Sequence, residues 1–286
     1  MTTATANIDG AARGERLYWL MLIAPCAFLA LFYLAPVLNV LVLSFTVPRP
    51  GVANYAELAN NAAVQRVLWT TLRIGAITTV LALLIGYIVA YALLQCGPRE
   101  RKILLGVVVA SFWLSALIRA FAWVALLQSR GVVNSALMGM GIIDSPLSLV
   151  RNELGVVIGM VHYMLPYAIL PLYTSLRGID DRLVPAARAL GATPAQAFRW
   201  VFLPLSIPGL IGAGVIVMIF SLGFYITPAI LGGGRTIMVA EFISVQISET
   251  LRWGLAAMLA TMLLSAVLLL VMWLSRFMDV EQALRK

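Results

Sequence analysis

The sequence contains very little of what catalytic sites are built from. It has one histidine, two cysteines and 12 acidic residues among 286. A single histidine excludes a multi-histidine metal site, and no acidic pair lies within an apolar run to supply other ligands. His162 has neither a Gly-x-Ser-x-Gly elbow nor a buried acid to support nucleophilic catalysis. The sequence therefore favours a protein that is not an enzyme and that carries no metal or other cofactor.

A phosphate-binding motif is also missing. No segment matches G-x-x-x-x-G-K-[ST], and the glycine run 232–234 is followed by Arg-Thr. If ATP and magnesium provide the energy for this protein, they bind to another chain. Cys26 lies inside the first apolar run and Cys96 ends the second, at depths about 13 Å apart. That separation argues against a structural disulfide.

The sequence is rich in apolar residues. Hydrophobic residues make up 62% of it and the mean hydropathy is +0.97, which indicates an integral membrane protein. We expect an all-α polytopic membrane protein whose single transmembrane domain covers residues 17–276, between cytoplasmic tails at 1–16 and 277–286. The first run is too long for a cleaved signal peptide. The six expected transmembrane helices cover about 17–45, 67–95, 103–128, 154–176, 207–231 and 253–275.

The net charge of +8 is distributed unevenly between alternate polar segments. Arginine and lysine concentrate in cytoplasmic segments, so the side with more of them is predicted to face the cytoplasm. The basic composition therefore indicates membrane topology and not nucleic-acid binding, with both termini and the central loop in the cytoplasm. The residues on this side are Arg13, Arg16, Arg99, Arg101, Lys102, Arg177, Arg182, Arg188, Arg199, Arg276, Arg285 and Lys286.

The fourth run contains two prolines, Pro166 and Pro171, and the glycine pair Gly155 and Gly159. Prolines free backbone carbonyls that lipid cannot satisfy, and small residues let helices approach closely. We therefore expect this helix to be enclosed by protein or to face an aqueous cavity. External loops are expected at 46–66, 129–152 and 232–252, the second with a short surface helix over 132–140. Arg73, near the outer end of its run, is expected to reach the headgroups.

The polar interruption at residues 177–204 contains four arginines and two aspartates. Pro185 can open a helix, Gly191 can end it, and Thr193-Pro194 can cap a second helix that is expected to stop at Pro204. The interruption contains an Ala-Ala pair, a glycine four residues after the pair, and then a hydrophobic stretch that ends in Leu-Pro: Ala186, Ala187, Gly191, Phe198, Val201, Leu203 and Pro204. This pattern resembles the EAA loop of the membrane subunits of binding-protein-dependent ABC importers, a cytoplasmic coupling helix that docks on the ATPase subunit. The resemblance implies that these residues and Arg188 couple the chain to the ATPase.

Pro185 occupies the position of the family's glutamate, so a salt bridge from that position to the ATPase is not expected. The alternative for the whole loop is an amphipathic helix on the membrane surface without a partner. An assembly or signalling scaffold is a further alternative.

Polar and aromatic residues inside the apolar runs mark either a solute path or buried pairs. Arg119 is interpreted either as a cation that lines the path or as a paired, structural arginine, with Trp123 one turn away as a ring for cation contact. The other candidates are His162, Tyr163, Tyr167, Phe224 and Tyr225, for which ordinary packing is the alternative. Glu241, in an external loop, is either a cation contact or a solvated charge.

Three further segments, 117–123, 165–173 and 228–233, resemble permeases of the spermidine/putrescine branch of the same family, with the MetI-like fold of type I importers. The resemblance implies a bacterial inner-membrane subunit that works with an ATPase dimer, a second permease subunit and a periplasmic solute-binding protein. Opines, aminophosphonates or other small solutes are alternatives to a polyamine. An ion-coupled carrier is disfavoured because no carboxylate lies inside the six runs.

Overall fold

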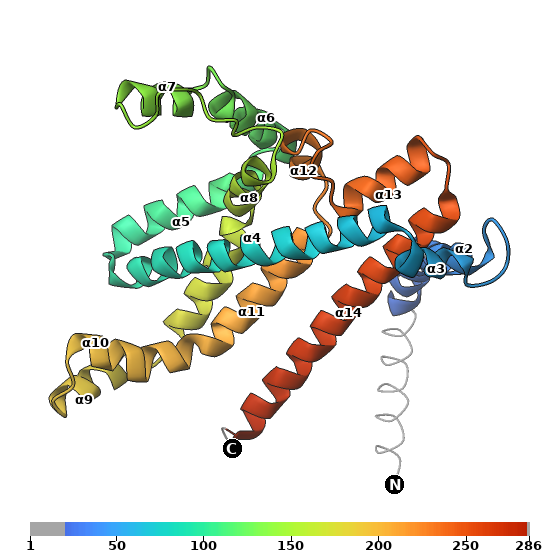
Figure 1. Cartoon of the computed structure of the whole chain (residues 1–286). Helices are drawn as coiled ribbons and strands as arrows, with labels where there is room; N and C mark the ends of the chain where they lie inside the picture. Colours follow the sequence, from blue (N-terminus) through green and yellow to red (C-terminus); the bar gives the residue numbers. More distant parts are fainter. Residues whose placement is uncertain (1–20, 285–286) are drawn as a thin grey trace, which may run out of the picture.

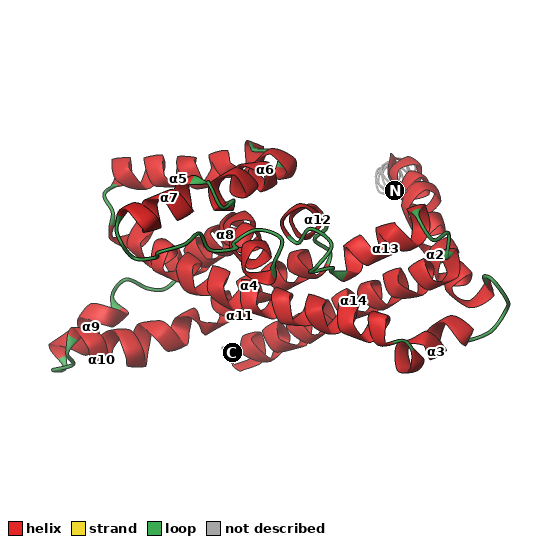
Figure 2. Ribbon diagram, turned by 45° about the horizontal axis from the view of Figure 1, so that its top comes forward, coloured by secondary structure: helices red, strands yellow, loops and turns green. Residues whose placement is uncertain are grey.

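The computed structural model describes the backbone of residues 21–284 and the side chains of residues 21–276. This part of the chain is almost entirely helical and contains no strand (Figure 2). Six helices within it are long and apolar enough to cross a membrane, which confirms the predicted fold class. The predicted tail at 1–16 lies outside the described residues. The six spans are Met21–Thr46, Ala62–Gln95, Ala116–Gly139, Glu153–Arg177, Pro194–Leu222 and Trp253–Arg276.

The short helices gather at two opposite ends of the bundle. In Figure 1, α9 and α10 lie on the lower side with the C-terminal end of α14, whereas α12 and α13 lie on the upper side. The elements are η1 (Ala30–Leu34), α2 (Ala35–Thr46), α3 (Ala53–Asn60), α4 (Ala62–Gln95), α5 (Pro98–Trp113), α6 (Ala116–Leu127), α7 (Val132–Gly139), α8 (Glu153–Arg177), α9 (Leu183–Ala189), α10 (Pro194–Ala197), η2 (Phe198–Phe202), α11 (Leu203–Leu222), α12 (Ile226–Leu231), α13 (Val239–Ser248) and α14 (Trp253–Leu284).

Helix α8 is the central element of the bundle. Just over half of its most apolar window, 56%, is buried, a larger share than in any other described span. It packs along α4 and α11, and a Cβ added to Gly86 of α4 would lie 2.9 Å from the Cβ of Ala168. Pro166 is buried and Pro171 is half-buried, so protein covers most of this helix, as predicted for a helix that carries two prolines.

The first span differs from the others because none of its most apolar window is buried. It contacts the rest of the chain near its C-terminal end, where α2 packs on α14 and Ser44 is fully buried. Asn39, about 10 Å before the end of α2, is exposed. The first span is therefore packed on one side and only over part of its length.

The third apolar run, predicted to be continuous over 103–128, is interrupted, and the third of the six spans begins only after the break, at Ala116. Helix α5 ends at Trp113, Leu114 and Ser115 are extended, and α6 begins at Ala116. The break is possible inside an apolar segment because the Arg119 side chain donates hydrogen bonds to the carbonyls of Ser111 and Leu114. The short helix expected over 132–140 is confirmed as α7.

The fifth crossing begins earlier than predicted, and the expected stop at Pro204 is wrong. Helix α10, η2 and α11 form one continuous helical stretch from Pro194 to Leu222. Within η2 the turn is π-helical, and the amide of Leu203 reaches back to the carbonyl of Phe198. Pro204 follows in the first turn of the next α-helical segment, where a missing amide is tolerated. Gly223 ends this helix, so α12 is a separate element.

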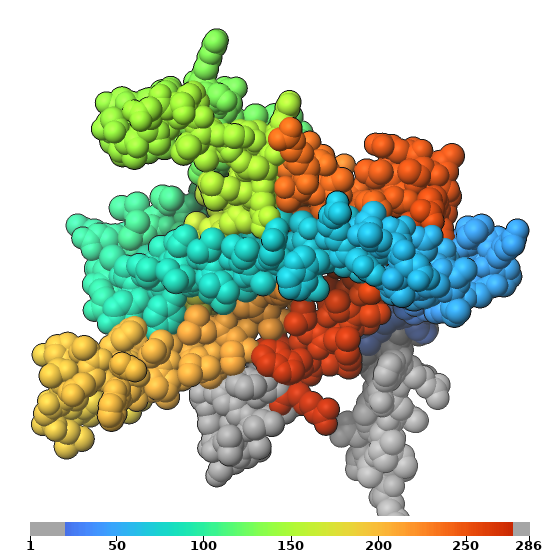
Figure 3. Space-filling view, in the orientation of Figure 1, coloured from blue at the N-terminus to red at the C-terminus, as the bar shows by residue number. Residues whose placement is uncertain are grey.

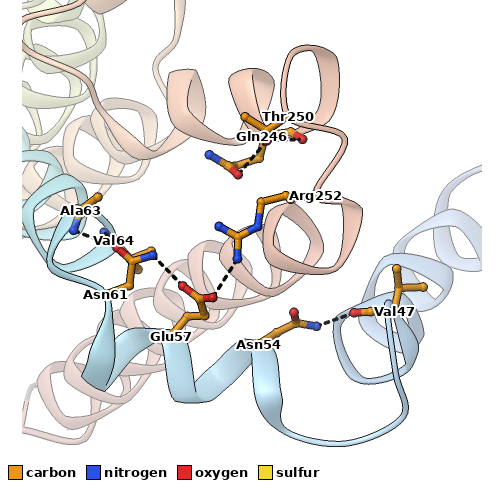
Figure 4. Close-up of polar contacts among 9 residues, drawn as sticks. All are labelled: Val47, Asn54, Glu57, Asn61, Ala63, Val64, Gln246, Thr250 and Arg252. Atoms are coloured by element: carbon orange, nitrogen blue, oxygen red, sulfur yellow. Dashed lines mark hydrogen bonds and ion pairs between the residues drawn. The ribbon is translucent and has the colours of Figure 1, made fainter.

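Two of the loops predicted to be external contain helices that the sequence did not reveal. Helix α3 lies within the loop predicted at 46–66, and α13 within the loop predicted at 232–252. Figure 4 shows Glu57 of α3 accepting hydrogen bonds from Asn61 and from Arg252, the latter at 2.7 Å. The hydrogen bond from Asn61 has the larger effect and that from Arg252 adds to it, and both lower the pKa of the Glu57 carboxyl. The Asn54 amide donates to the Val47 carbonyl at 2.7 Å and so holds the preceding turn to α3.

Candidate functional site

Residues 177–204, which we call the coupling loop after their predicted role, have the predicted form of a helix, a sharp bend and a second helix. Gly191 forms the bend with φ +95°, a conformation that favours glycine. Thr193 caps α10: its hydroxyl accepts from the amide of Gln196, and the Gln196 side chain accepts from the Thr193 amide at 2.8 Å. Figure 3 shows this loop protruding from one end of the molecule.

The outer face of the coupling loop is apolar although the loop protrudes. Leu190 is 90% exposed and Trp200 is 76% exposed. They border a groove of about 410 Å³, which could seat an apolar side chain of another protein. Its lining is Ala187, Leu190, Gly191, Ala192, Gln196, Ala197, Trp200 and Val201.

The remaining loop residues of the predicted set occupy different places. Ala186 and Arg188 are exposed on α9, and Leu203 and Pro204 form the first turn of α11. Phe198 points inward and packs against the large core cluster. Thus Ala187, Gly191 and Val201 share the groove, whereas Phe198 connects the loop to the bundle.

Arg119 has the partners that a structural arginine requires. It is 8% exposed, and besides the carbonyls of Ser111 and Leu114 its guanidinium lies 4.6 Å from the centre of the Tyr163 ring. Its charge thus stabilises the last turn of α5, where helix carbonyls carry partial negative charge. Its Nε has no hydrogen-bond partner among the described residues.

Trp123 does not supply the ring that was predicted for Arg119; Tyr163 does. The Arg119 side chain extends back towards α5, whereas Trp123 lies one turn further along α6. Its Nε1 instead donates a hydrogen bond of 3.1 Å to Nδ1 of His162. Arg119 and Trp123 therefore each connect α6 to α8, through adjacent residues of α8.

Aromatic rings form a continuous series along one face of α8. Tyr163 lies 4.4 Å from Phe224 and 6.0 Å from Tyr167, measured between ring centres. Tyr167 in turn lies 4.9 Å from Phe112 and 4.5 Å from Phe220. We call these five residues the aromatic series. Sequence reasoning missed Phe112 and Phe220, because nothing in their own segments distinguishes them from lipid-facing phenylalanines.

The aromatic series is only partly covered. Phe112 is 42% exposed and Phe220 is 46% exposed, while the two tyrosines and Phe224 are half-buried. Tyr225, next to the series, is 45% exposed. The series thus offers ring faces from α5, α8 and α11 to a neighbouring molecule or solute.

Glu241 is buried, so the alternative of a solvated loop charge is wrong. Its residue is 9% exposed in α13, and burial raises the pKa of its carboxyl. One oxygen, Oε2, has no hydrogen-bond partner among the described residues. A buried carboxyl with a free oxygen is suited to bind one amine or ammonium group.

No group of three or more histidine, cysteine or acidic residues in the described part of the chain could hold a metal ion.

Comparison with known proteins identifies the family. The family described as "Binding-protein-dependent transport system inner membrane component" matches residues 82–280. The spermidine/putrescine transport system permease protein PotB of Haemophilus influenzae is 35% identical over 256 residues, covering 86% of this chain and 89% of that protein. PotB of Escherichia coli is 31% identical over 222 residues, covering 77% and 80%.

A solved structure has the same fold. It is a chain of a bacterial alginate ABC transporter in complex with an alginate pentasaccharide-bound periplasmic protein, with a TM-score of 0.79. The match covers 93% of this chain and 94% of that chain at 17% identity, and at that identity it speaks for the fold alone. The chain therefore belongs to the family of binding-protein-dependent transport system inner membrane components, and it is a permease subunit of an ABC importer and not itself an enzyme.

Proposed function

We propose that this chain is one of two permease subunits that pass a polyamine-type solute from a periplasmic binding protein to the cytoplasm. ATP and magnesium bind to a partner ATPase dimer, and the coupling loop docks on it. The observation that carries this proposal is the exposed apolar groove between Leu190 and Trp200, on a loop that the family resemblance identifies as the coupling element. Both termini and this loop then face the cytoplasm.

The first span supports the presence of a second permease subunit. Its most apolar window is unburied, and the side chain of Asn39 in the same span is exposed. Hydrocarbon offers no hydrogen-bond partner to an amide, and asparagine is too short to reach the headgroups from there. A helix of the second permease subunit, packed against this span, satisfies Asn39 and covers the unburied window.

Three features favour an organic cation as the solute. The partly exposed rings of the aromatic series can face ammonium groups, which bind to aromatic faces. Glu241 supplies a carboxyl with a free oxygen. The positive charge of Arg119 is held by two carbonyls and a ring, which reduces its repulsion of a cation. The relatives named as spermidine/putrescine permeases agree with this chemistry.

The same residues disfavour the anionic alternatives. An opine or aminophosphonate carries carboxylate or phosphonate groups, which need a free cation or amide donors on the path. Two hydrogen bonds and a ring contact hold the Arg119 guanidinium, and its unpartnered Nε is buried. Transport then proceeds by alternating access, in which movement of the coupling loop rocks α8 and α11 about their proline and glycine breaks.

The docking step can be tested by co-purification. Leu190→Ala and Trp200→Ala should each reduce the amount of ATPase subunit that is recovered with the permease from detergent extracts, because each removes apolar surface from the groove. Trp253→Ala, which removes a half-exposed tryptophan at the outer end of α14, is the matched control. Full recovery with both groove variants would contradict docking at this surface.

The solute can be tested by uptake into proteoliposomes that contain the assembled complex. Radiolabelled spermidine should enter only with ATP and the binding protein, and Tyr167→Ala and Glu241→Gln should lower this uptake. Spermidine uptake without ATP, or transport of an opine and not of spermidine, would show that the proposal is wrong.

A further inference from the structure

A cluster of rings at the inner end of the bundle joins the coupling loop to α4. We call Tyr87, Tyr91, Phe198 and Phe202 the aromatic clamp. The Tyr91 ring lies 5.4 Å from that of Phe198 and 5.3 Å from that of Phe202, in both cases edge-on. Phe198 and Phe202 stack at 5.8 Å, and Tyr87 lies 6.5 Å from Phe198. Edge-on and stacked rings at these distances attract one another beyond their apolar burial.

One ring of the clamp, Phe202, is buried and the other three are half-buried, although the clamp borders an exposed part of the chain. Phe202 is 8% exposed, whereas Trp200, two residues earlier, is 76% exposed. The π-helical turn η2 has these two residues on opposite sides, so the same turn presents Trp200 outward and Phe202 to α4. Any force applied at the groove therefore acts on a turn whose other face is held by Tyr91.

A hydrogen bond continues the clamp into α11. The hydroxyl of Ser206, which is fully buried, donates to the Leu203 carbonyl at 2.7 Å. The Tyr87 hydroxyl lies 3.0 Å from the same Ser206 oxygen and, since the serine proton is already used, acts as the donor. The first turn of α11 is thus connected to α4 by a polar contact as well as by rings.

Helix α4 leads from the clamp to the outer end of the bundle. It has 34 residues, about 51 Å of helix, and contains no proline, unlike α8 and α11. Near its outer end, the hydroxyl of Thr71 accepts a hydrogen bond of 2.8 Å from the amide of Val239, the first residue of α13. Val64 and Val67 of α4 pack with Val239 in one buried cluster. An uninterrupted helix therefore connects the coupling loop to the element that carries Glu241.

We propose that the aromatic clamp transmits displacement of the coupling loop to α4, and that α4 carries this movement to α13 at the outer face. This inference rests on the proposed docking of the ATPase at the groove. In it, Tyr91 is a positioning residue: it touches neither the ATPase nor the solute, and it acts by keeping η2 and α4 together. The second span is then a moving part of the transport cycle, in addition to α8 and α11.

The test separates docking from transmission in the complete complex with its ATPase and binding protein. Tyr91→Leu keeps apolar volume but removes the ring, and the number of spermidine molecules transported per ATP hydrolysed should fall about tenfold. Recovery of the ATPase subunit should be unchanged, in contrast to the groove variants Leu190→Ala and Trp200→Ala. Tyr91→Phe keeps the ring and should restore the transport ratio, and Trp69→Ala, on the exposed outer part of α4, is the control.

Two results for the ratio of transport to ATP hydrolysis would overturn the inference. One is an unchanged ratio of transport to ATP hydrolysis in Tyr91→Leu. The other is equal loss in Tyr91→Leu and Tyr91→Phe, because the ring contact would then not be the cause. If the leucine variant fails to fold, the pair Phe198→Leu and Phe198→Tyr gives the same comparison from the other side of the contact. Loss of ATPase recovery in the Tyr91 variants would instead assign the clamp to docking and also contradict the inference.

Discussion

Replacing Arg119 with methionine distinguishes a structural arginine from one that acts on the solute. Methionine keeps an unbranched apolar stem but donates no hydrogen bond. The carbonyls of Ser111 and Leu114 would lose their donor at the end of α5, and the Tyr163 ring would lose its cation. Because the break between α5 and α6 lies inside an apolar crossing, water cannot replace this donor without cost.

The size of the effect follows from these contacts. A hydrogen bond from a charged donor contributes about 1.5–3 kcal/mol, and a cation over a ring about 0.5–2 kcal/mol. Contacts inside membrane bundles measure smaller, about 0.6 kcal/mol on average. We expect a loss of about 3 kcal/mol, which for a chain of this size lowers the unfolding temperature by about 5 °C.

The assay is thermal unfolding of the purified complex in detergent, followed by uptake per folded complex. Arg73→Met is the matched control, because Arg73 pairs with Glu153 at a site where the two side chains are 46% and 36% exposed. Such a pair contributes about 1 kcal/mol at most. Arg119→Met should therefore unfold well below Arg73→Met and transport normally while folded. An unchanged unfolding temperature with abolished uptake would refute the structural assignment.

Three further predictions concern packing and pH. Gly159→Ala should destabilise the subunit by about 1–2 kcal/mol, because the added Cβ would lie 2.5 Å from the Leu231 side chain. Gly212→Ala is the control, because its added Cβ would have no atom within 4 Å. Unfolding temperatures of the two variants test this difference. The folded pKa of Glu57 is lowered, so the stability that it contributes with Arg252 is present above pH 4.5 and lost as pH falls. Wild type and Arg252→Gln should therefore converge in unfolding temperature at low pH, and parallel curves would contradict this. The folded pKa of Glu241 is raised, so the stability that its protonated carboxyl contributes is lost as pH rises above 4.5. The unfolding temperature of Glu241→Gln, measured against pH, should lack this decline.

Apolar runs and charge distribution predict the six crossings and the coupling loop, because both follow from properties that each segment has by itself. The breaks were harder to predict. The extended link at Leu114 and Ser115 exists because Arg119 satisfies carbonyls on the other side of the break, and a count of apolar residues cannot show this. The continuous helix through Pro204 likewise depends on a π-helical turn, which has no residue signature of its own.

Individual candidate residues were recognised better than their partners. Arg119, Trp123, His162 and Tyr163 do lie together, but which ring meets the arginine depends on the course of its side chain towards α5. Glu241 looked exposed because its loop is polar, and the helix that buries it is short. Tertiary packing, which brings α13 against α14, decides its environment.

The π-helical turn η2 gives one place in the chain an unusual tolerance to a lost residue. Its hydrogen bond spans five residues and not four, so the turn contains about one residue more than an α-helical turn for nearly the same rotation. Deleting one residue within η2 would therefore convert the turn to an α-helix and leave the preceding groove facing nearly the same way. The same deletion within α11 would instead rotate everything that precedes it by about 100° relative to the rest of that helix, because an α-helix has no residue to spare.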